Sequence, residues 1–198
     1  MCRFIETIKV VDGKIMNLER HVQRVMETAK HFQYNELHID RERLESIAKA
    51  SVGISKLRFI YDRTGIHDIT CTPYMMRRIS QLLLADGNAI DYSFKYEDRT
   101  MLDSMKRHSG KETEMLIVKD GFVTDTTYTN VAFNDGKQWL TPRKPLLAGT
   151  KRALLIEKGL ITEHDIKPSD INNYHSIALF NAMIELGEAV LPISAIKK

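Results

Sequence analysis

The sequence predicts an α+β fold with mostly antiparallel sheet, divided into two small lobes over residues 1–88 and 89–198. Short segments in which apolar and polar residues alternate recur along the chain, and turn dipeptides such as Asp12-Gly13 and Asp86-Gly87 separate them. Helical spacing of apolar residues is confined to a few segments. The 198 residues, 43% of them hydrophobic and 28% charged, are enough to bury a core.

In the first lobe we expect a small sheet with two helices. Residues 3–11 are typical of a strand that enters the Asp12-Gly13 turn and returns over residues 14–16. Asn17 and Asp40 are candidate N-caps of two amphipathic helices, one over residues 18–33 and one that stops near Gly53. Further strands are predicted over residues 56–62, 66–73 and 78–84.

In the second lobe we expect two hairpins, one helix and two closing strands. The hairpins are predicted over residues 114–125 and 131–141, the helix over 150–158, and the strands over 176–180 and 190–193. Side chains in residues 90–96 also alternate between apolar and polar, which predicts one more strand with Lys95 on its polar face.

Charge and cysteine usage exclude several classes of protein. The net charge of +3, from 29 basic and 26 acidic residues, is too small to indicate nucleic acid as a partner, although it suits an anionic ligand. Cys2, Cys71 and the seven histidines lack a metal-ligand spacing, so we expect no metal. We find no signal-peptide pattern and no apolar run long enough for a bilayer, so we expect a cytoplasmic protein with no membrane partner. Gly-rich nucleotide loops, Gly-x-Ser-x-Gly and His-Glu-x-x-His are also absent.

Lys95 is the first candidate for chemistry. It either lies on the solvated face of a half-buried strand, as most lysines do, or faces a cleft between the lobes. In the second case partial burial would lower the pKa of its amine and free it for nucleophilic attack. The sequence leaves both possibilities open.

Asp125 and Asn130 lie in the polar run of residues 124–130, between two apolar strand segments. Each is either an ordinary turn residue or part of a site, with the carboxylate of Asp125 paired to a ring N–H and Asn130 supporting the loop or the acid.

Gly149, Thr150 and Lys151 open the predicted helix of residues 150–158. The glycine permits close approach of the backbone, and the first helical turn offers free N–H groups that favour an anion. An ordinary helix cap is the alternative. Arg24 borders the apolar stripe of the first helix, where it is either a solvated or salt-bridged group or a clamp on a phosphate.

Taken in order, these segments resemble the class IV aminotransferase family, the fold type IV pyridoxal phosphate enzymes. The family includes branched-chain aminotransferases, D-amino acid aminotransferases and aminodeoxychorismate lyases. The resemblance covers nearly the whole chain, from Phe4-Ile5-Glu6-Thr7-Ile8-Lys9 through Asn17-Leu18-Glu19-Arg20-His21 to Phe180-Asn181-Ala182-Met183. It implies a two-lobed fold like that of D-amino acid aminotransferase, pyridoxal 5'-phosphate as cofactor and a homodimer. Because the family's usual first strand and its loop are missing, we expect the fold to be shortened at the N-terminus.

The resemblance also implies roles for individual residues. Lys95 is similar to the lysine that forms the Schiff base, and Asp125 stands where the family has its ring-nitrogen acid, usually a glutamate. The expected phosphate-binding residues are Arg24, Gly149, Thr150, Lys151, Asn181 and Ala182, with Asn130 in support. The phosphate turn has Gly-Thr-Lys-Arg where many relatives have Gly-Ile-Thr-Arg, which backbone donors tolerate.

The implied activity is that of a lyase or a transaminase acting on a small amino acid or amino-chorismate substrate. Lys-x-x-Asp-Arg at residues 95–99 and Asn181-Ala182-Met183 are similar to the lyase's Lys-x-x-Asn-Arg and Asn-Ala-Leu. They favour 4-amino-4-deoxychorismate lyase, a folate-biosynthesis activity, over a branched-chain or D-amino acid transaminase. Two other classes stay open: a non-catalytic dimeric relative, and a weak anion- or nucleic-acid-binding module that uses Arg77-Arg78 and Lys106-Arg107-His108.

Overall fold

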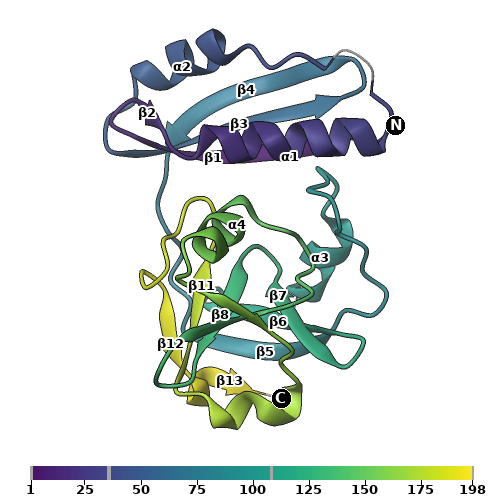
Figure 1. Cartoon of the computed structure of the whole chain (residues 1–198), viewed down its shortest axis with the longest axis vertical. Helices are drawn as coiled ribbons and strands as arrows, with labels where there is room; N and C mark the ends of the chain where they lie inside the picture. The colour runs from purple at the N-terminus through teal and green to yellow at the C-terminus, as the bar shows by residue number, and fades with distance from the viewer. Residues whose placement is uncertain (1, 35–36, 108, 198) are drawn as a thin grey trace. The chain divides into compact units, whose positions relative to one another are not determined.

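The computed structural model describes residues 2–34, 37–107 and 109–197, so His108 lies outside the described residues. Contacts divide the chain into two compact units (Figure 1). The first unit contains the chain up to Met76 together with Phe94–Asp98, and the second contains Arg77–Ser93 and the chain from Arg99 onward. The predicted lobes of residues 1–88 and 89–198 stay a prediction. The two compact units have other boundaries: residues 77–88 belong to the unit of the later part of the chain, and residues 94–98 to the unit of the earlier part.

In the part of the first unit that the structure describes, a four-stranded sheet carries two helices. The strands β1 (Phe4–Val11), β2 (Lys14–Ile15), β3 (Ile54–Asp62) and β4 (Gly65–Pro73) pair antiparallel in the order β2-β1-β3-β4. The helices are α1 (Leu18–His31) and α2 (Arg41–Lys49). Asp12 and Gly13 both have positive φ, at 47° and 79°, as a tight hairpin between β1 and β2 requires.

Both helices pack on the same face of this sheet. Alternate residues of β1 and β3 point into one core, which is closed by Val25 and Ala29 of α1 and by Leu44 and Ala48 of α2. The strand residues of this core are Phe4, Ile8, Val10, Leu57, Phe59 and Tyr61. Glu6 is fully buried between Phe4 and Ile8 on this otherwise apolar face.

Over its described residues the second unit contains two sheets and two α-helices. One sheet has the order β10-β9-β8-β11-β12 and the other β13-β5-β6-β7. The elements are β5 (Gln81–Asp86), α3 (Thr100–Met105), β6 (Thr113–Lys119), β7 (Phe122–Thr126), β8 (Asn130–Asn134), β9 (Trp139–Pro142), α4 (Thr150–Glu157), β10 (Thr162–His164), η1 (Pro168–Asn173), β11 (Ser176–Phe180), β12 (Val190–Pro192), η2 (Ile193–Ala195) and β13 (Ile196–Lys197).

The core of the second unit is formed from both sheets. It includes Leu82 and Leu116 of one sheet with Phe133, Ile177 and Leu179 of the other. A smaller cluster joins α4 to β8 and β11 through Leu155, Ala132 and Phe180, which fixes where α4 begins (Figure 1). The packing of α4 on these strands therefore sets the position of the Gly149-Thr150 turn.

The α+β class with mostly antiparallel pairing is confirmed, since only β5–β6, β9–β10 and β5–β13 pair in parallel among the described strands. The strand predicted over residues 90–96 is wrong: this segment forms only an isolated bridge between Tyr96 and Phe4. Asp91 accepts hydrogen bonds from the backbone N–H and the hydroxyl of Ser93, and this local turn competes with an extended strand. Helix α3 and strand β10 were not predicted. None of the helices in the described ranges is long and apolar enough to cross a membrane.

Candidate functional site

In the first unit, Arg24 is bound to a buried carboxylate. The guanidinium of Arg24 donates from Nε to Oε1 of Glu6 at 2.8 Å and from Nη2 to Oε2 at 2.6 Å. Glu6 is held by β1 and Arg24 by α1, and His21, one turn earlier on α1, lies 2.6 Å from Glu6 Oε2 through Nδ1. The Arg24 side chain keeps 13% of its surface exposed. Arg24 is thus a fixed, charge-paired group at the edge of the core.

The pKa values of this group assign the protons. Burial would raise the pKa of Glu6, but the charge of Arg24 and the hydrogen bond with His21 lower it to about 2. Burial also lowers the pKa of His21, against the opposing effect of Glu6. With Glu6 ionised and His21 neutral, Nδ1 of His21 must carry the hydrogen that it shares with the carboxylate.

Lys95 lies in a segment that runs along the start of β1. Its carbonyl accepts a hydrogen bond from Ile5 N at 3.0 Å, and Glu97 N donates to Arg3 O at 2.9 Å. The residue is partly buried. Burial, Glu6 and Arg24 have the larger effects on the pKa of His21, and the positive charge of Lys95 lowers it further. Lys95 is therefore near the Glu6–Arg24 pair.

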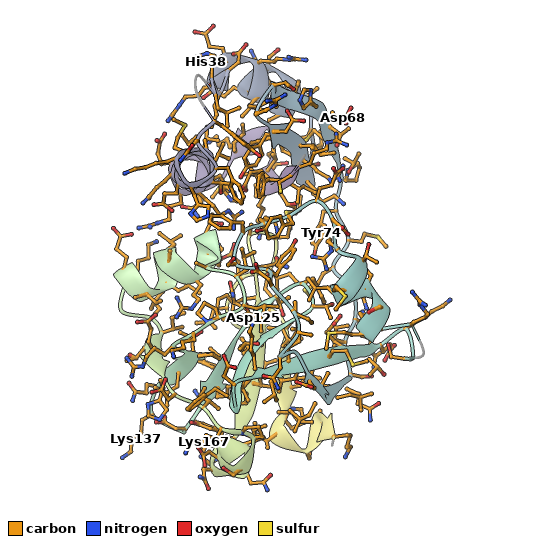
Figure 2. All side chains as sticks on the ribbon, turned by 90° about the vertical axis from the view of Figure 1, so that its right-hand side faces the viewer. His38, Asp68, Tyr74, Asp125, Lys137 and Lys167 are labelled. Atoms are coloured by element: carbon orange, nitrogen blue, oxygen red, sulfur yellow. The ribbon has the colours of Figure 1, made fainter. Side chains whose placement is uncertain are left out.

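In the second unit, Asp125 and Asn130 meet across a tight turn. Thr126 N donates to Thr129 O at 2.9 Å and the two threonine hydroxyls lie 2.7 Å apart, so the chain reverses between β7 and β8. This reversal allows Asn130 Nδ2 to donate to Asp125 Oδ1 at 2.8 Å. The spacing of five residues therefore brings the acid and the amide together. Figure 2 labels Asp125 inside the second unit.

The loop before α4 completes the surroundings of Asp125. Leu147 N donates to Asp125 Oδ2 at 2.9 Å, and Leu147 O accepts from Asn130 Nδ2 at 2.9 Å. Asp125 is 4% exposed, and among the described residues no cation lies within ion-pair distance of it. Burial raises the pKa of Asp125 to about 6, and the hydrogen bonds from Leu147 and Asn130 oppose this rise.

Helix α4 begins beside this loop, with Gly149 as its N-cap. Gly149 makes no side-chain cap and Thr150 is buried. The side chain of Lys151 is directed to Glu185, with Nζ 2.5 Å from Oε2, and Arg152 donates from Nη2 to Pro142 O at 2.9 Å. The first turn of α4 can therefore offer backbone N–H groups, while its two cationic side chains bind protein acceptors.

Asn181 and Ala182 lie in the turn after β11. Asn181 Oδ1 accepts from Met183 N at 2.8 Å and from Ile184 N at 3.1 Å. Asn181 Nδ2 donates to Tyr128 O at 3.1 Å, which ties this turn to the one between Asp125 and Asn130. Ala182 is partly buried.

The residues predicted from the sequence thus fall into two groups. Arg24 and Lys95 lie in the first unit, and the others lie in the second, where Asp125, Asn130 and the turn of Gly149 are joined by hydrogen bonds. The prediction gave Glu6 no role, although an acid on the apolar face of an alternating strand signals a buried partner. Leu147 takes part through its backbone, which no side-chain pattern reveals. No cluster of metal-binding side chains occurs in the part of the chain that the structure describes.

Comparison with known proteins gives the family. The family model described as amino-transferase class IV matches residues 3–196. An "Uncharacterized protein" of Haemophilus influenzae is 30% identical over 189 residues, covering 92% of this chain and 98% of that one.

Two solved structures share the fold. A "putative 4-amino-4-deoxychorismate lyase" from Haemophilus somnus is 31% identical with a TM-score of 0.82, covering 94% of this chain and 98% of that one. A "hypothetical aminotransferase" from Mycobacterium tuberculosis in its PLP-bound form is 21% identical with a TM-score of 0.80, covering 99% and 81%. This chain belongs to the amino-transferase class IV family.

Proposed function

We propose that this protein is a pyridoxal phosphate enzyme that acts on an amino acid or amino-acid-like substrate, and that it releases pyruvate and 4-aminobenzoate from 4-amino-4-deoxychorismate. Members of the family are pyridoxal phosphate-dependent aminotransferases or lyases. The observation that carries the proposal is the buried carboxylate of Asp125, which is held by uncharged donors and has a raised pKa.

The chemistry of the donor set fits the cofactor. A protonated ring nitrogen needs a buried acid as partner, and Asp125 accepts hydrogen bonds from the Asn130 amide and the Leu147 N–H but forms no ion pair within the described ranges. A cationic partner would relieve the cost of ionising this acid. Asp125 would therefore hold the proton of the ring nitrogen.

The expected phosphate-binding groups also have suitable chemistry. Helix α4 begins at Thr150, and the dipole of the helix favours an anion at this end. Arg24 is kept in one orientation by its two hydrogen bonds to Glu6. In the second unit we propose the start of α4 as a phosphate-binding group, with Asn181 and Ala182 in support, and in the first unit we propose Arg24 as the phosphate-binding arginine that the family resemblance implies.

Lys95 is the group that would hold the cofactor covalently through Nζ. When bound, pyridoxal phosphate supplies an aldehyde for attachment of amines and a ring that withdraws electrons from the substrate. Lys95 would supply the amine that takes the α-proton of a bound substrate as a base, and the hydrogen bond from Ile5 N to its carbonyl holds its segment beside β1.

The choice of a lyase rests on two observations. The Haemophilus somnus protein, which is 31% identical to this chain, has the name "putative 4-amino-4-deoxychorismate lyase". The Lys-x-x-Asp-Arg and Asn-Ala-Met segments are similar to those of the lyases. A transaminase of the branched-chain or D-amino acid type is the second candidate, since the same acid, lysine and phosphate groups serve both reactions.

The cofactor is tested by colour and covalent trapping. The purified protein, incubated with pyridoxal phosphate, is expected to turn yellow. After borohydride reduction, Lys95 is expected to carry the added mass of the cofactor. Lys95→Ala should lose both signals, whereas Lys30→Ala, which removes an exposed lysine of α1, should keep them. A wild-type protein that takes up no cofactor would support the non-catalytic alternative.

The reaction is tested with the loaded protein and 4-amino-4-deoxychorismate. Pyruvate, detected by coupled reduction, and fluorescent 4-aminobenzoate should appear in equal amounts. Nitrogen exchange between an amino acid and 2-oxoglutarate, without pyruvate release from the chorismate substrate, would instead establish the transaminase.

A further inference from the structure

We propose that Asn130 is a positioning residue that locks the Asp125 carboxylate to the loop before α4, and that residue 149 is glycine because the Asn130 side chain occupies the space of its Cβ. The functional part of this inference rests on the proposed pairing of Asp125 with the ring nitrogen. The steric part concerns the protein alone.

Three hydrogen bonds form a closed ring. Asn130 Nδ2 donates to Asp125 Oδ1 at 2.8 Å and to Leu147 O at 2.9 Å, and Leu147 N donates to Asp125 Oδ2 at 2.9 Å. Both partners of Nδ2 are acceptors, so the orientation of the amide is fixed: the nitrogen, with its two hydrogens, must face them. The remaining oxygen of the amide is thereby aimed at Gly149.

Gly149 does not need a glycine's conformational freedom. Its φ of −71° and ψ of 142° are accessible to any residue. A Cβ added to Gly149, however, would lie 2.0 Å from Asn130 Oδ1 and 3.1 Å from Asn130 Cγ. Asn130 is 6% exposed and cannot move away without breaking both of its donor bonds. The space beside Gly149 is therefore used by the side chain that holds the acid.

The consequence is a rigid link between two proposed cofactor contacts. Asp125 on β7 and the start of α4 are far apart in sequence. Oδ1 of Asp125 nevertheless accepts from Asn130, whose side chain lies against Gly149, and Oδ2 accepts from Leu147, two residues before Gly149. Aspartate has a shorter side chain than the glutamate usual in the family, so its reach depends more on where the backbone is held. Asn130 and Leu147 supply that support.

A double-mutant cycle in the cofactor-free protein tests the steric part. Gly149→Ala should lower the folding equilibrium constant about 10- to 100-fold through overpacking. In an Asn130→Ala background the same substitution should cost less than about threefold, because the clashing oxygen is gone. Equal losses in the two backgrounds would overturn the explanation of Gly149. If Gly149→Ala does not fold, recovery of folding by adding Asn130→Ser supports it, and continued failure contradicts it.

The titration of Asp125 tests the positioning role. We expect Asn130→Ala to raise the pKa of Asp125, followed through the side-chain carboxyl carbon by NMR, because a donor to the ionised form is lost. Asn134→Ala is the matched control: Asn134 ends the same strand and binds Gly136 N, away from the acid, so the titration should not move. An unchanged titration in Asn130→Ala would refute the positioning role.

Cofactor binding then separates the two proposals. Asn130→Ala should weaken pyridoxal phosphate binding about tenfold, the effect of one hydrogen bond, while Asn134→Ala should not. If the wild-type protein binds no cofactor, the proposed function fails. The double-mutant cycle and the titration still show whether Asn130 blocks a Cβ at residue 149 and supports the carboxylate of Asp125. If the wild type binds cofactor and Asn130→Ala binds it equally well, the locking of Asp125 is refuted.

Discussion

Arg24 and Glu6 form a two-point ion pair between α1 and β1, with the carboxylate fully buried and the guanidinium at the edge of the core. Such a pair fixes the direction of the arginine more than it stabilises the fold, because burying the charges costs much of what their attraction returns. The remaining N–H groups of a guanidinium held in this way keep a defined direction. Arg24 is therefore suited to orient an anion.

Replacing Glu6 should expose how strongly the pair is coupled. Glu6→Gln leaves a buried polar group and an arginine without its charge partner, so we expect a loss of about 3 kcal/mol in the free energy of unfolding. Chemical denaturation of the cofactor-free protein measures this loss.

Glu19→Gln is the control for this change. Glu19 also pairs with an arginine, Arg41, but both side chains are exposed at the surface. We expect little change in stability there, because water screens the pair. Equal losses in the two variants would contradict the special role of the Glu6–Arg24 pair.

The pH dependence of stability should carry the signature of Asp125. Its folded pKa of about 6 lies above the ordinary value of 3.8, so its contribution is fully present below pH 3.8 and is lost as the pH rises through 6. Relative to Asp125→Asn, which cannot ionise, the cofactor-free wild type should lose about 2.4 kcal/mol of its free energy of unfolding between pH 4 and pH 7.

Parallel denaturation curves over this pH range measure that difference. Glu6 contributes with the opposite sign: its folded pKa of about 2 lies below 4.5, so its stabilisation is present above pH 4.5 and lost as the pH falls through 2. A wild type that tracks Asp125→Asn at every pH would show that the acid is not buried as described.

The local parts of the fold could be predicted because local chemistry determines them. The Asp12-Gly13 turn set the first hairpin, and Asp40, whose carboxylate accepts from Arg43 N, set the start of α2. Asn17 marked the start of α1 correctly, although its side chain makes no capping bond there. The alternation of apolar and polar residues over residues 90–96 gave a wrong strand prediction. Alternation shows that one side of a segment is apolar and the other polar, but it does not show whether the segment has a neighbouring strand to pair with.

Contacts between the candidate residues could be predicted only where the two residues are close in the sequence and a local turn brings them together. Asp125 and Asn130 meet because a four-residue turn reverses the chain between them. Glu6 with Arg24 and Asp125 with Leu147 join residues 18 and 22 positions apart, and these contacts depend on how helices and loops pack. From the sequence, Gly149 could be said only to permit close approach of the backbone, whereas the structure shows that the Asn130 side chain lies where a Cβ of residue 149 would be.

The start of α4 allows a test of whether backbone donors hold the phosphate. Thr150 is the first residue of the helix, where proline is tolerated, and Gly149 already has the extended conformation that a following proline requires. Thr150→Pro should therefore keep α4 while removing one N–H, and pyridoxal phosphate should bind about 10- to 100-fold more weakly, the effect of a hydrogen bond to a charged group. Lys151→Met should weaken binding less than about threefold, because its ammonium is engaged by Glu185. Fluorescence titration of each variant, with circular dichroism to verify the helix, gives the comparison. A larger effect of Lys151→Met than of Thr150→Pro would mean that the lysine side chain, and not the backbone, holds the anion.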